Sequence, residues 1–163
     1  MDEEEYGRLL EPLLYPAAGY ACSILRDRHQ AQDAVQQAAL RGLERIRTFD
    51  ARWPFKGWWF AILRHCCIDM LRELNVSKVV RLGVDPPAAV PVNVEDDVED
   101  WERLSECMLQ LSADHQEILR LKYFGDLSYR EIAEALSIPQ GTVMSRLHLA
   151  RQALAAKMRE AKR

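Results

Sequence analysis

Apolar residues recur at helical spacing in two blocks of the chain, and no stretch alternates convincingly with the period of two expected of a half-buried strand. The first block ends near residue 74 and the second begins at Trp101. Between them lie three prolines and a late cluster of acidic residues, which favour an extended or partly disordered linker. The pattern predicts an all-α fold of two small helical domains, residues 1–75 and 101–163, joined by an acidic, proline-containing linker over residues 76–100.

The first block predicts three or four helices. The apolar face of the first helix would be formed by Leu9, Leu10, Leu13 and Leu14. Asp27 is suited to cap a later helix, because its side chain can accept a hydrogen bond from the backbone of the first turn. Val35, Ala39 and Leu43 then recur every four residues and give that helix an apolar face. A long final helix is predicted by the apolar stripe of Trp59, Ile62 or Leu63, Cys66, Met70 and Leu74.

The second block contains two short helices joined by a tight turn, in the sequence LSYREIAEALSIPQGTVMSRLHLAR. Ser128 and Glu131 lie three residues apart before an apolar residue, which is the pattern of a capping box and predicts a helix that starts near Tyr129. The interruption is short, and Pro139 suits the first turn of a second helix that would run to about Leu154. This arrangement is typical of a helix-turn-helix, whose second helix enters the major groove of DNA.

Polar and basic side chains occupy the outward face of this second helix if Val143 and Leu147 point inward. The residues expected to contact duplex DNA are Lys122, Gln140, Met144, Ser145, Arg146, His148 and Arg151. The whole chain has a net charge of −3. Residues 112–163, however, hold nine Lys and Arg against six Asp and Glu, a local net of +3. The negative charge lies largely in the linker and the N-terminus, so it does not oppose DNA binding here. A three-helix bundle that binds protein is the alternative for this segment.

Aromatic and basic residues alternate in the segment RTFDARWPFKGWWFAILRH of the first block. Such a mixture can stack on unpaired bases and neutralise the nucleic-acid backbone. The alternative is that the aromatic side chains belong to the core. Trp59 falls on the apolar stripe of the long helix, so Trp58, one position round, is the better candidate for an exposed face.

Nothing in the sequence indicates an enzyme. The four histidines are scattered, and no catalytic grouping, phosphate loop or metal-ligand spacing accompanies them. We therefore expect no catalytic residue, no cofactor and no metal. No apolar run approaches the roughly 20 residues that span a bilayer. The N-terminal MDEEEYGRLL is acidic where a secretory signal would be basic, which predicts a cytoplasmic protein without a membrane span.

Three segments resemble, in this order, the extracytoplasmic-function (ECF) sigma factors of bacterial RNA polymerase. They are AQDAVQQAALRGLERIRTFD, PFKGWWFAILRHCCIDMLREL and LSADHQEILRLKYFGDLSYREIAEALSIPQGTVMSRLHLAR, and the resemblance covers nearly the whole chain. It implies a protein that binds core RNA polymerase, directs promoter-specific initiation and is held by an anti-sigma factor. A helix-turn-helix regulator without a sigma role is the alternative. That alternative leaves the aromatic-basic segment and the acidic linker unexplained.

The resemblance also implies roles for individual residues. The first domain would be sigma region two, and it would dock on core polymerase through Asp33, Gln36 and Gln37. It would read the minus-ten element and hold melted non-template bases through Phe55, Lys56, Trp58, Arg64, His65 and Asp69. The second domain would be region four, and it would read the minus-thirty-five element through the outward helix face described above. The linker would run toward the active centre of the polymerase.

This chain departs from the family's usual pattern at two surfaces. The family commonly has acidic residues where Gln32 and Gln37 stand, and its polymerase partner surface is basic. Fewer charges predict weaker docking, unless the amides form hydrogen bonds that serve as well. The family also often has basic residues where Met144 and Leu149 stand. Their loss predicts fewer phosphate contacts, and either apolar side chain could instead meet a thymine methyl group or a protein.

Overall fold

The computed structural model describes residues 1–80 and 98–162, with side chains described within residues 1–75 and 102–162. Those residues form helices and turns, and no strand occurs among them, which confirms the predicted all-α class. The prolines and most acidic residues of the predicted linker lie outside the described residues. Within the described ranges, no helix has both the length and the hydrophobicity of a membrane span.

The N-terminal unit consists of α1 (Glu3–Leu10), α2 (Leu14–Leu25), α3 (Arg28–Glu44) and α4 (Phe55–Val80), with short 3-10 turns at Glu11–Leu13 and Ile46–Thr48. Asp27 caps α3 as predicted, because its carboxylate accepts a hydrogen bond from the backbone N–H of Gln30 at 2.9 Å. Helix α4 continues to Val80, beyond the apolar stripe that predicted it.

Burial in this unit follows the predicted helix faces with one exception. Trp59, Leu63 and Cys66 are fully buried, so the stripe on α4 is core. Leu9 and Leu14 were expected on a buried face, but both are exposed. The 3-10 turn between α1 and α2 has fewer residues per turn than an α-helix, so it shifts the phase of the apolar face at this point.

Two hydrogen bonds, one buried and one partly buried, join α1, α3 and α4. The Tyr6 hydroxyl donates to the Ala39 carbonyl oxygen at 2.7 Å, and Trp59 Nε1 donates to the same hydroxyl at 3.1 Å. Gly42 lies beside them, and a Cβ at that position would come within 2.3 Å of Tyr6 Oη. The three helices therefore approach closely here, and this packing holds the start of α4 and the loop that precedes it.

The C-terminal unit consists of α5 (Val98–Leu109), α6 (Ala113–Tyr123), α7 (Tyr129–Leu136) and α8 (Gln140–Ala161). The predicted capping box is confirmed: Glu131 N–H donates to Ser128 Oγ at 3.2 Å, and Ser128 N–H donates to Glu131 Oε2 at 2.7 Å. Ser137 adopts a left-handed backbone with φ of 53°, which turns the chain from α7 toward α8. Ile132 and Val143 are fully buried between these helices.

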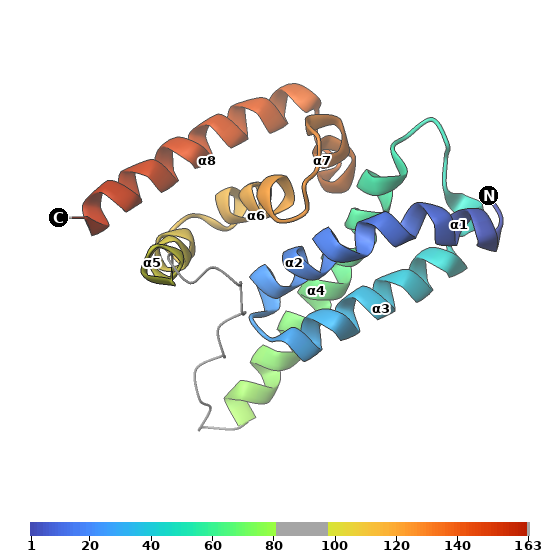
Figure 1. The fold of residues 1–163 in the computed structure, drawn as a ribbon, viewed down its shortest axis with the longest axis horizontal. Helices are drawn as coiled ribbons and strands as arrows, with labels where there is room; N and C mark the ends of the chain where they lie inside the picture. The colour runs from blue at the N-terminus through green and yellow to red at the C-terminus, as the bar shows by residue number, and fades with distance from the viewer. Residues whose placement is uncertain (81–97, 163) are drawn as a thin grey trace.

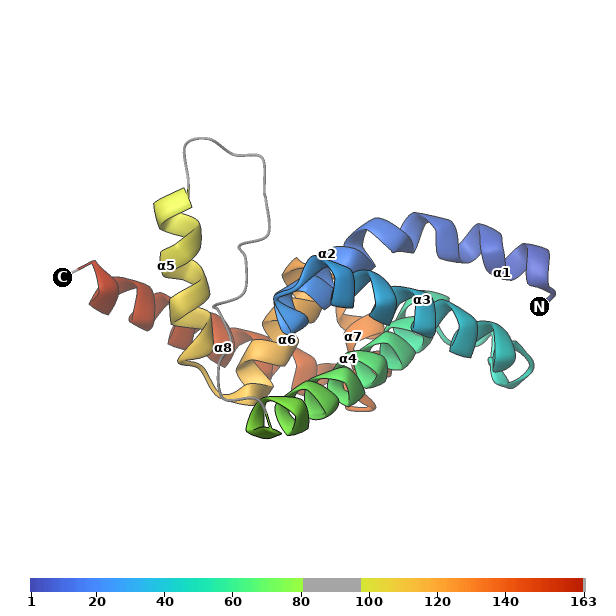
Figure 2. The ribbon, with the colours of Figure 1, turned by 90° about the horizontal axis from the view of Figure 1, so that it is seen from below.

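The two units lie against each other, mainly through α4 and α7, with α2 beside α6. Figures 1 and 2 show this contact from two directions, with the C-terminal end of α8 extending away from it. Buried side chains of both units form one continuous hydrophobic cluster. The second unit therefore packs directly on the first.

Candidate nucleic-acid interface

Helix α8 carries all but one of the side chains predicted from the sequence to contact duplex DNA; Lys122 belongs to α6. Val143 and Leu147 are fully buried on the inward side of the helix. The exposed members of the predicted set are Gln140, Met144, Ser145, His148 and Arg151. Arg146 and Lys122 are half-buried. The outward face combines cations, hydrogen-bonding groups and one apolar side chain, which is the mixture that reads base edges and phosphates in a major groove.

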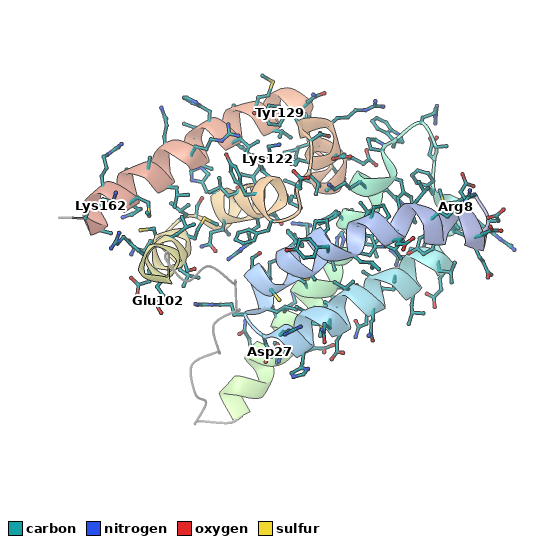
Figure 3. The ribbon with its side chains drawn as sticks, in the orientation of Figure 1. Arg8, Asp27, Glu102, Lys122, Tyr129 and Lys162 are labelled. Carbon is teal, nitrogen blue, oxygen red and sulfur yellow. The ribbon has the colours of Figure 1, made fainter. Side chains whose placement is uncertain are left out.

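Two tyrosines hold basic side chains where α6, α7 and α8 meet. Arg151 Nε donates to Tyr123 Oη at 2.7 Å, and its guanidinium carbon lies 5.7 Å from the centre of that ring. Lys122 Nζ donates to the Leu127 carbonyl oxygen at 3.1 Å and lies 5.6 Å from the centre of the Tyr129 ring; both labelled residues appear in Figure 3. The hydrogen bonds of Arg151 with Tyr129 and Tyr123 raise its pKa further above its already high ordinary value.

An aromatic cluster forms where the loop meets α4. The ring centre of Phe49 lies 5.6 Å from that of Phe55 and 5.1 Å from that of Trp58. Tyr6 packs edge-on against Phe55 at 5.8 Å. Trp58 is half-buried rather than openly exposed because its ring packs in this cluster, whereas Trp53 in the loop is 50% exposed. The cluster therefore has a packed inner side and an accessible outer side.

Two basic side chains of α4 from the predicted minus-ten set are already bound by the C-terminal unit. Lys56 Nζ donates to the Asp126 carbonyl oxygen at 2.6 Å. Arg64 forms an ion pair with Glu117, through Nε and Oε1. The Arg64 and Glu117 side chains are only 25% and 23% exposed, so water screens this pair less than it screens a surface pair. No local pattern in the sequence indicates either partner.

The remaining two members of the predicted minus-ten set lie further along α4. Asp69 accepts a hydrogen bond from Arg41 Nη1 of α3 at 3.3 Å, and both side chains are partly exposed. His65 is exposed, and its Nδ1 lies 2.7 Å from the Ala61 carbonyl oxygen. An exposed pair of this kind contributes little to stability.

The residues expected to dock on polymerase share one exposed face of α3. Asp33, Gln36 and Gln37 all lie on this face, while Ala34 on the opposite side is fully buried. Leu40 extends the same face by one turn and is 64% exposed. Leu40 was not among the predicted docking residues, although its spacing from Gln36 and Gln37 places it on their face of α3.

A helical unit with an aromatic-basic loop, followed by a helix-turn-helix, defines a transcription initiation factor of the sigma-70 class. The family model "Sigma-70 region 2" matches residues 8–75, and "Sigma-70, region 4" matches residues 101–154. The ECF RNA polymerase sigma factor SigL of Mycobacterium tuberculosis is 32% identical over 145 residues, which cover 86% of this chain and 81% of SigL. SigW of Bacillus subtilis is 30% identical over 149 residues, which cover 81% of this chain and 77% of SigW. The chain belongs to the ECF sigma factors of RNA polymerase.

Solved structures share the fold over both units. The sigma factor RpoE of Bartonella quintana, solved in complex with the anti-sigma factor NepR, aligns with a TM-score of 0.76 at 22% identity, covering 96% of this chain and 98% of RpoE. CnrH, solved with the cytosolic domain of CnrY, aligns with a TM-score of 0.70 at 20% identity, covering 95% of this chain and 88% of CnrH. These likenesses establish the all-α, two-unit architecture.

Proposed function

We propose that this ECF sigma factor divides promoter recognition among three surfaces of the described residues. The face of α3 around Asp33 docks on core polymerase, the outward face of α8 reads the minus-thirty-five duplex, and the aromatic cluster before α4 holds melted minus-ten bases. The chain itself catalyses no reaction and needs no cofactor, because the polymerase supplies the chemistry. The observation that carries this proposal is the presence of a duplex-reading face and a base-stacking surface in one chain.

Reading of the minus-thirty-five element rests on the exposure of α8. The major groove is wide enough for one helix, and Gln140, Ser145 and His148 can reach base edges from it. Lys122 flanks the helix and Arg151 lies on it, and both suit contacts with phosphates, which supply most of the sequence-independent affinity. Base readers and phosphate contacts thus lie on adjoining surfaces, as a docked recognition helix requires.

Capture of melted bases rests on the aromatic cluster and its basic neighbours. Unstacking a base costs a few kcal/mol, and stacking on an aromatic side chain returns about 1–3 kcal/mol per base. Trp53, Phe55 and Trp58 offer such rings. Lys56 and Arg64, on the first turns of α4, can bind the backbone of the same strand. This surface therefore offsets part of the cost of keeping the promoter open.

An anti-sigma factor is the further protein partner that we propose, acting on this chain in the cytoplasm. Met144 and Leu149 on α8 are 55% and 53% exposed, where the family often has basic residues. Apolar side chains on a DNA-reading helix contribute little to phosphate binding. They are suited to contact with a protein that covers the helix.

Run-off transcription tests the proposal. Core RNA polymerase and the full chain are supplied with a promoter selected from a randomised library. Trp58→Ala and Arg151→Ala should each abolish specific initiation, since one removes a stacking ring and the other a phosphate contact. Tyr15→Ala and Arg8→Ala are matched controls, because both residues are exposed and lie outside the proposed surfaces. Initiation that survives both site variants would contradict the proposal, as would a footprint of the chain alone on a palindrome, which would favour the regulator alternative.

A further inference from the structure

His65 lies on the same face of α4 as Trp58. The two residues are seven positions apart, which is almost two full helical turns, so their side chains point in nearly the same direction. His65 is exposed, whereas Ile62 and Cys66 beside it are buried. One accessible stripe of α4 therefore runs from the aromatic cluster to the imidazole of His65.

The ring of His65 is oriented by its own helix. Its Nδ1 lies 2.7 Å from the carbonyl oxygen of Ala61, one turn earlier. A carbonyl oxygen can only accept a hydrogen bond, so Nδ1 carries the ring proton and donates it. In the neutral imidazole the other nitrogen then has no hydrogen, and Nε2 is a hydrogen-bond acceptor. Across residues 1–75 and 102–162, no group is hydrogen-bonded to Nε2.

The polar neighbours of His65 on α4 are already engaged. Asp69 lies four positions after His65 and accepts a hydrogen bond from Arg41 Nη1 at 3.3 Å. Arg64, which precedes His65 in the chain, forms an ion pair with Glu117. His65 is thus the member of the predicted minus-ten set, on this part of α4, whose hydrogen-bonding atom is available to DNA.

The distance of His65 from the aromatic cluster indicates which part of the promoter it meets. Seven residues advance about 10 Å along a helix, which matches about three base-pair steps of 3.4 Å when α4 lies along the DNA. The rings suited to stack on unpaired bases, Phe49, Phe55 and Trp58, pack together at the start of α4. A base three steps away gains nothing from those rings. It therefore stays in the duplex and offers only its groove edge.

The major-groove edge distinguishes bases by the direction of their hydrogen bonds. Adenine and cytosine each present an amino group there, which donates, whereas guanine and thymine present only acceptors. Nε2 of the neutral His65 ring can accept from an amino group, but it has no hydrogen to donate to a keto oxygen. Two acceptors placed against each other leave both without a partner and lower the affinity.

We propose that His65 is a specificity-determining residue that selects adenine or cytosine in the duplex about three base pairs from the captured minus-ten bases. This inference rests on the proposed function and names the base chemistry that this part of the site takes. The Ala61 carbonyl oxygen sets the selection, because it fixes which ring nitrogen carries the proton. The amino group of the base donates to Nε2.

Transcription from a promoter library tests the proposal. The minus-ten region and its flanks are randomised beside a fixed minus-thirty-five element, and a barcode in each transcript identifies its promoter. The full chain and core RNA polymerase initiate at about pH 8, which favours the neutral imidazole. His65→Lys replaces the acceptor by a donor, whereas His65→Gln keeps an acceptor oxygen. Gln110→Lys is the matched control, because it adds the same charge at an exposed position of the C-terminal unit.

The expected result is a change of base preference at one position. There the wild type, His65→Gln and Gln110→Lys should prefer adenine or cytosine over guanine or thymine by about fivefold or more, as one mismatched base contact implies. His65→Lys should reverse that preference at this position alone. Equal preferences in wild type and His65→Lys would overturn the role of His65 while the proposed function stood. No specific initiation with any of the four proteins would contradict the proposed function, and this inference with it.

Base analogues identify the atom that His65 contacts. At the selected position, purine lacks the N6 amino group of adenine, and 2-pyrimidinone lacks the N4 amino group of cytosine. Initiation by the wild type should fall about fivefold when the analogue replaces the preferred base. His65→Lys makes no contact with the amino group, so its loss reports only the effect of the weaker base pair. An equal loss in both proteins would overturn the contact between Nε2 and the amino group.

Discussion

Arg151 of α8 donates a hydrogen bond through Nε to the hydroxyl oxygen of Tyr123, the last residue of α6, at 2.7 Å. Tyr123 is 58% exposed, so this ring is not part of the core. A free arginine side chain loses about 2 kcal/mol of rotamer entropy when it is fixed. Because Tyr123 already holds the guanidinium beside the recognition helix, Arg151 loses less of this entropy when it binds DNA. Tyr123 is therefore a positioning residue for a proposed phosphate contact.

Tyr123→Phe removes the acceptor but keeps the ring beneath Arg151. This hydrogen bond is exposed to solvent, so it contributes about 0.5–1.5 kcal/mol although its donor is charged, and affinity for the minus-thirty-five duplex should fall about two- to tenfold. The slope of log affinity against log salt should not change, because Arg151 can still reach its phosphate. Arg151→Ala should lower the magnitude of that slope by about 0.9. Anisotropy titrations between low and physiological salt measure both quantities.

A double-mutant cycle separates positioning from a general structural role. In the Arg151→Ala background, Tyr123→Phe should leave duplex affinity unchanged, since the side chain that it orients is gone. Tyr15→Phe is the matched control, because Tyr15 is 91% exposed on α2. An equal loss of affinity in both backgrounds would show that Tyr123 acts on DNA directly or through the fold.

Gly42→Ala should destabilise the N-terminal unit. A Cβ there would lie 2.3 Å from Tyr6 Oη and 3.2 Å from Trp59 Cδ1, so the hydrogen bonds of both rings would have to shift. Overpacking of this kind costs about 1–3 kcal/mol. That cost exceeds the gain of about 1 kcal/mol that alanine brings to a helix interior. Urea denaturation followed by circular dichroism gives the free energy of unfolding.

Two further variants test whether the Tyr6 hydroxyl causes the loss of stability in Gly42→Ala. Gly7→Ala on α1 has nothing within 4 Å of its Cβ, so it should be neutral or stabilising by up to about 1 kcal/mol. Tyr6→Phe removes the nearest atom, and in that background Gly42→Ala should cost less than in the wild type. A similar cost in both backgrounds would mean that the hydroxyl is not what limits the space.

Local signals explain why much of the helical unit could be predicted from sequence. A capping box such as Ser128 with Glu131 involves residues three apart, and the structure confirms it. The inward positions of α8, Val143 and Leu147, follow from a helical repeat and are fully buried. The order of the motifs indicated the sigma family, which the relatives confirm. Each of these inferences needed only residues close together in the chain or a recognisable segment.

Contacts between distant residues could not be predicted in the same way. The partners Lys56 and Asp126 lie 70 positions apart, and Arg64 and Glu117 lie 53 apart. Helical periodicity shows which face of a helix is buried, but it does not show which other helix covers that face. In the sequence, a basic residue beside aromatic residues predicts a DNA contact whether or not a carboxylate elsewhere in the chain forms an ion pair with it. The packing of the two units through α4 and α7 could therefore not be predicted from the sequence.

Gly57→Ala should separate the N-terminal and C-terminal units, which pack through α4 and α7, without any change of charge. Its Cβ would lie 2.7 Å from the Glu131 carbonyl oxygen, and a backbone atom cannot move aside as a flexible side chain can. Alanine also favours the helix to which Gly57 belongs, so the N-terminal unit itself should not be weakened. X-ray scattering should therefore show a larger maximum dimension. Gly141→Ala on α8, with nothing within 4 Å, should leave the dimension unchanged.

The exposed face of α3 around Asp33 carries two glutamines. Gln32 and Gln37 are exposed there and stand where the family commonly has acidic residues. Gln32→Glu with Gln37→Glu should raise affinity for core RNA polymerase by about two- to thirtyfold, because each exposed ion pair contributes about 0.2–1 kcal/mol. The gain should shrink at high salt, since salt screens exposed charges.

Competition against a labelled sigma factor for core polymerase, at two salt concentrations, measures that gain. Asn75→Asp with Gln110→Glu is the matched control, since it adds the same charge at exposed positions away from the α3 face. Affinity that rises only in the first variant would show that the glutamines weaken docking, and that this chain relies on other contacts to compete for polymerase. Unchanged affinity would show that the amides of Gln32 and Gln37 dock as well as carboxylates, so docking at these positions depends on hydrogen bonds rather than charge.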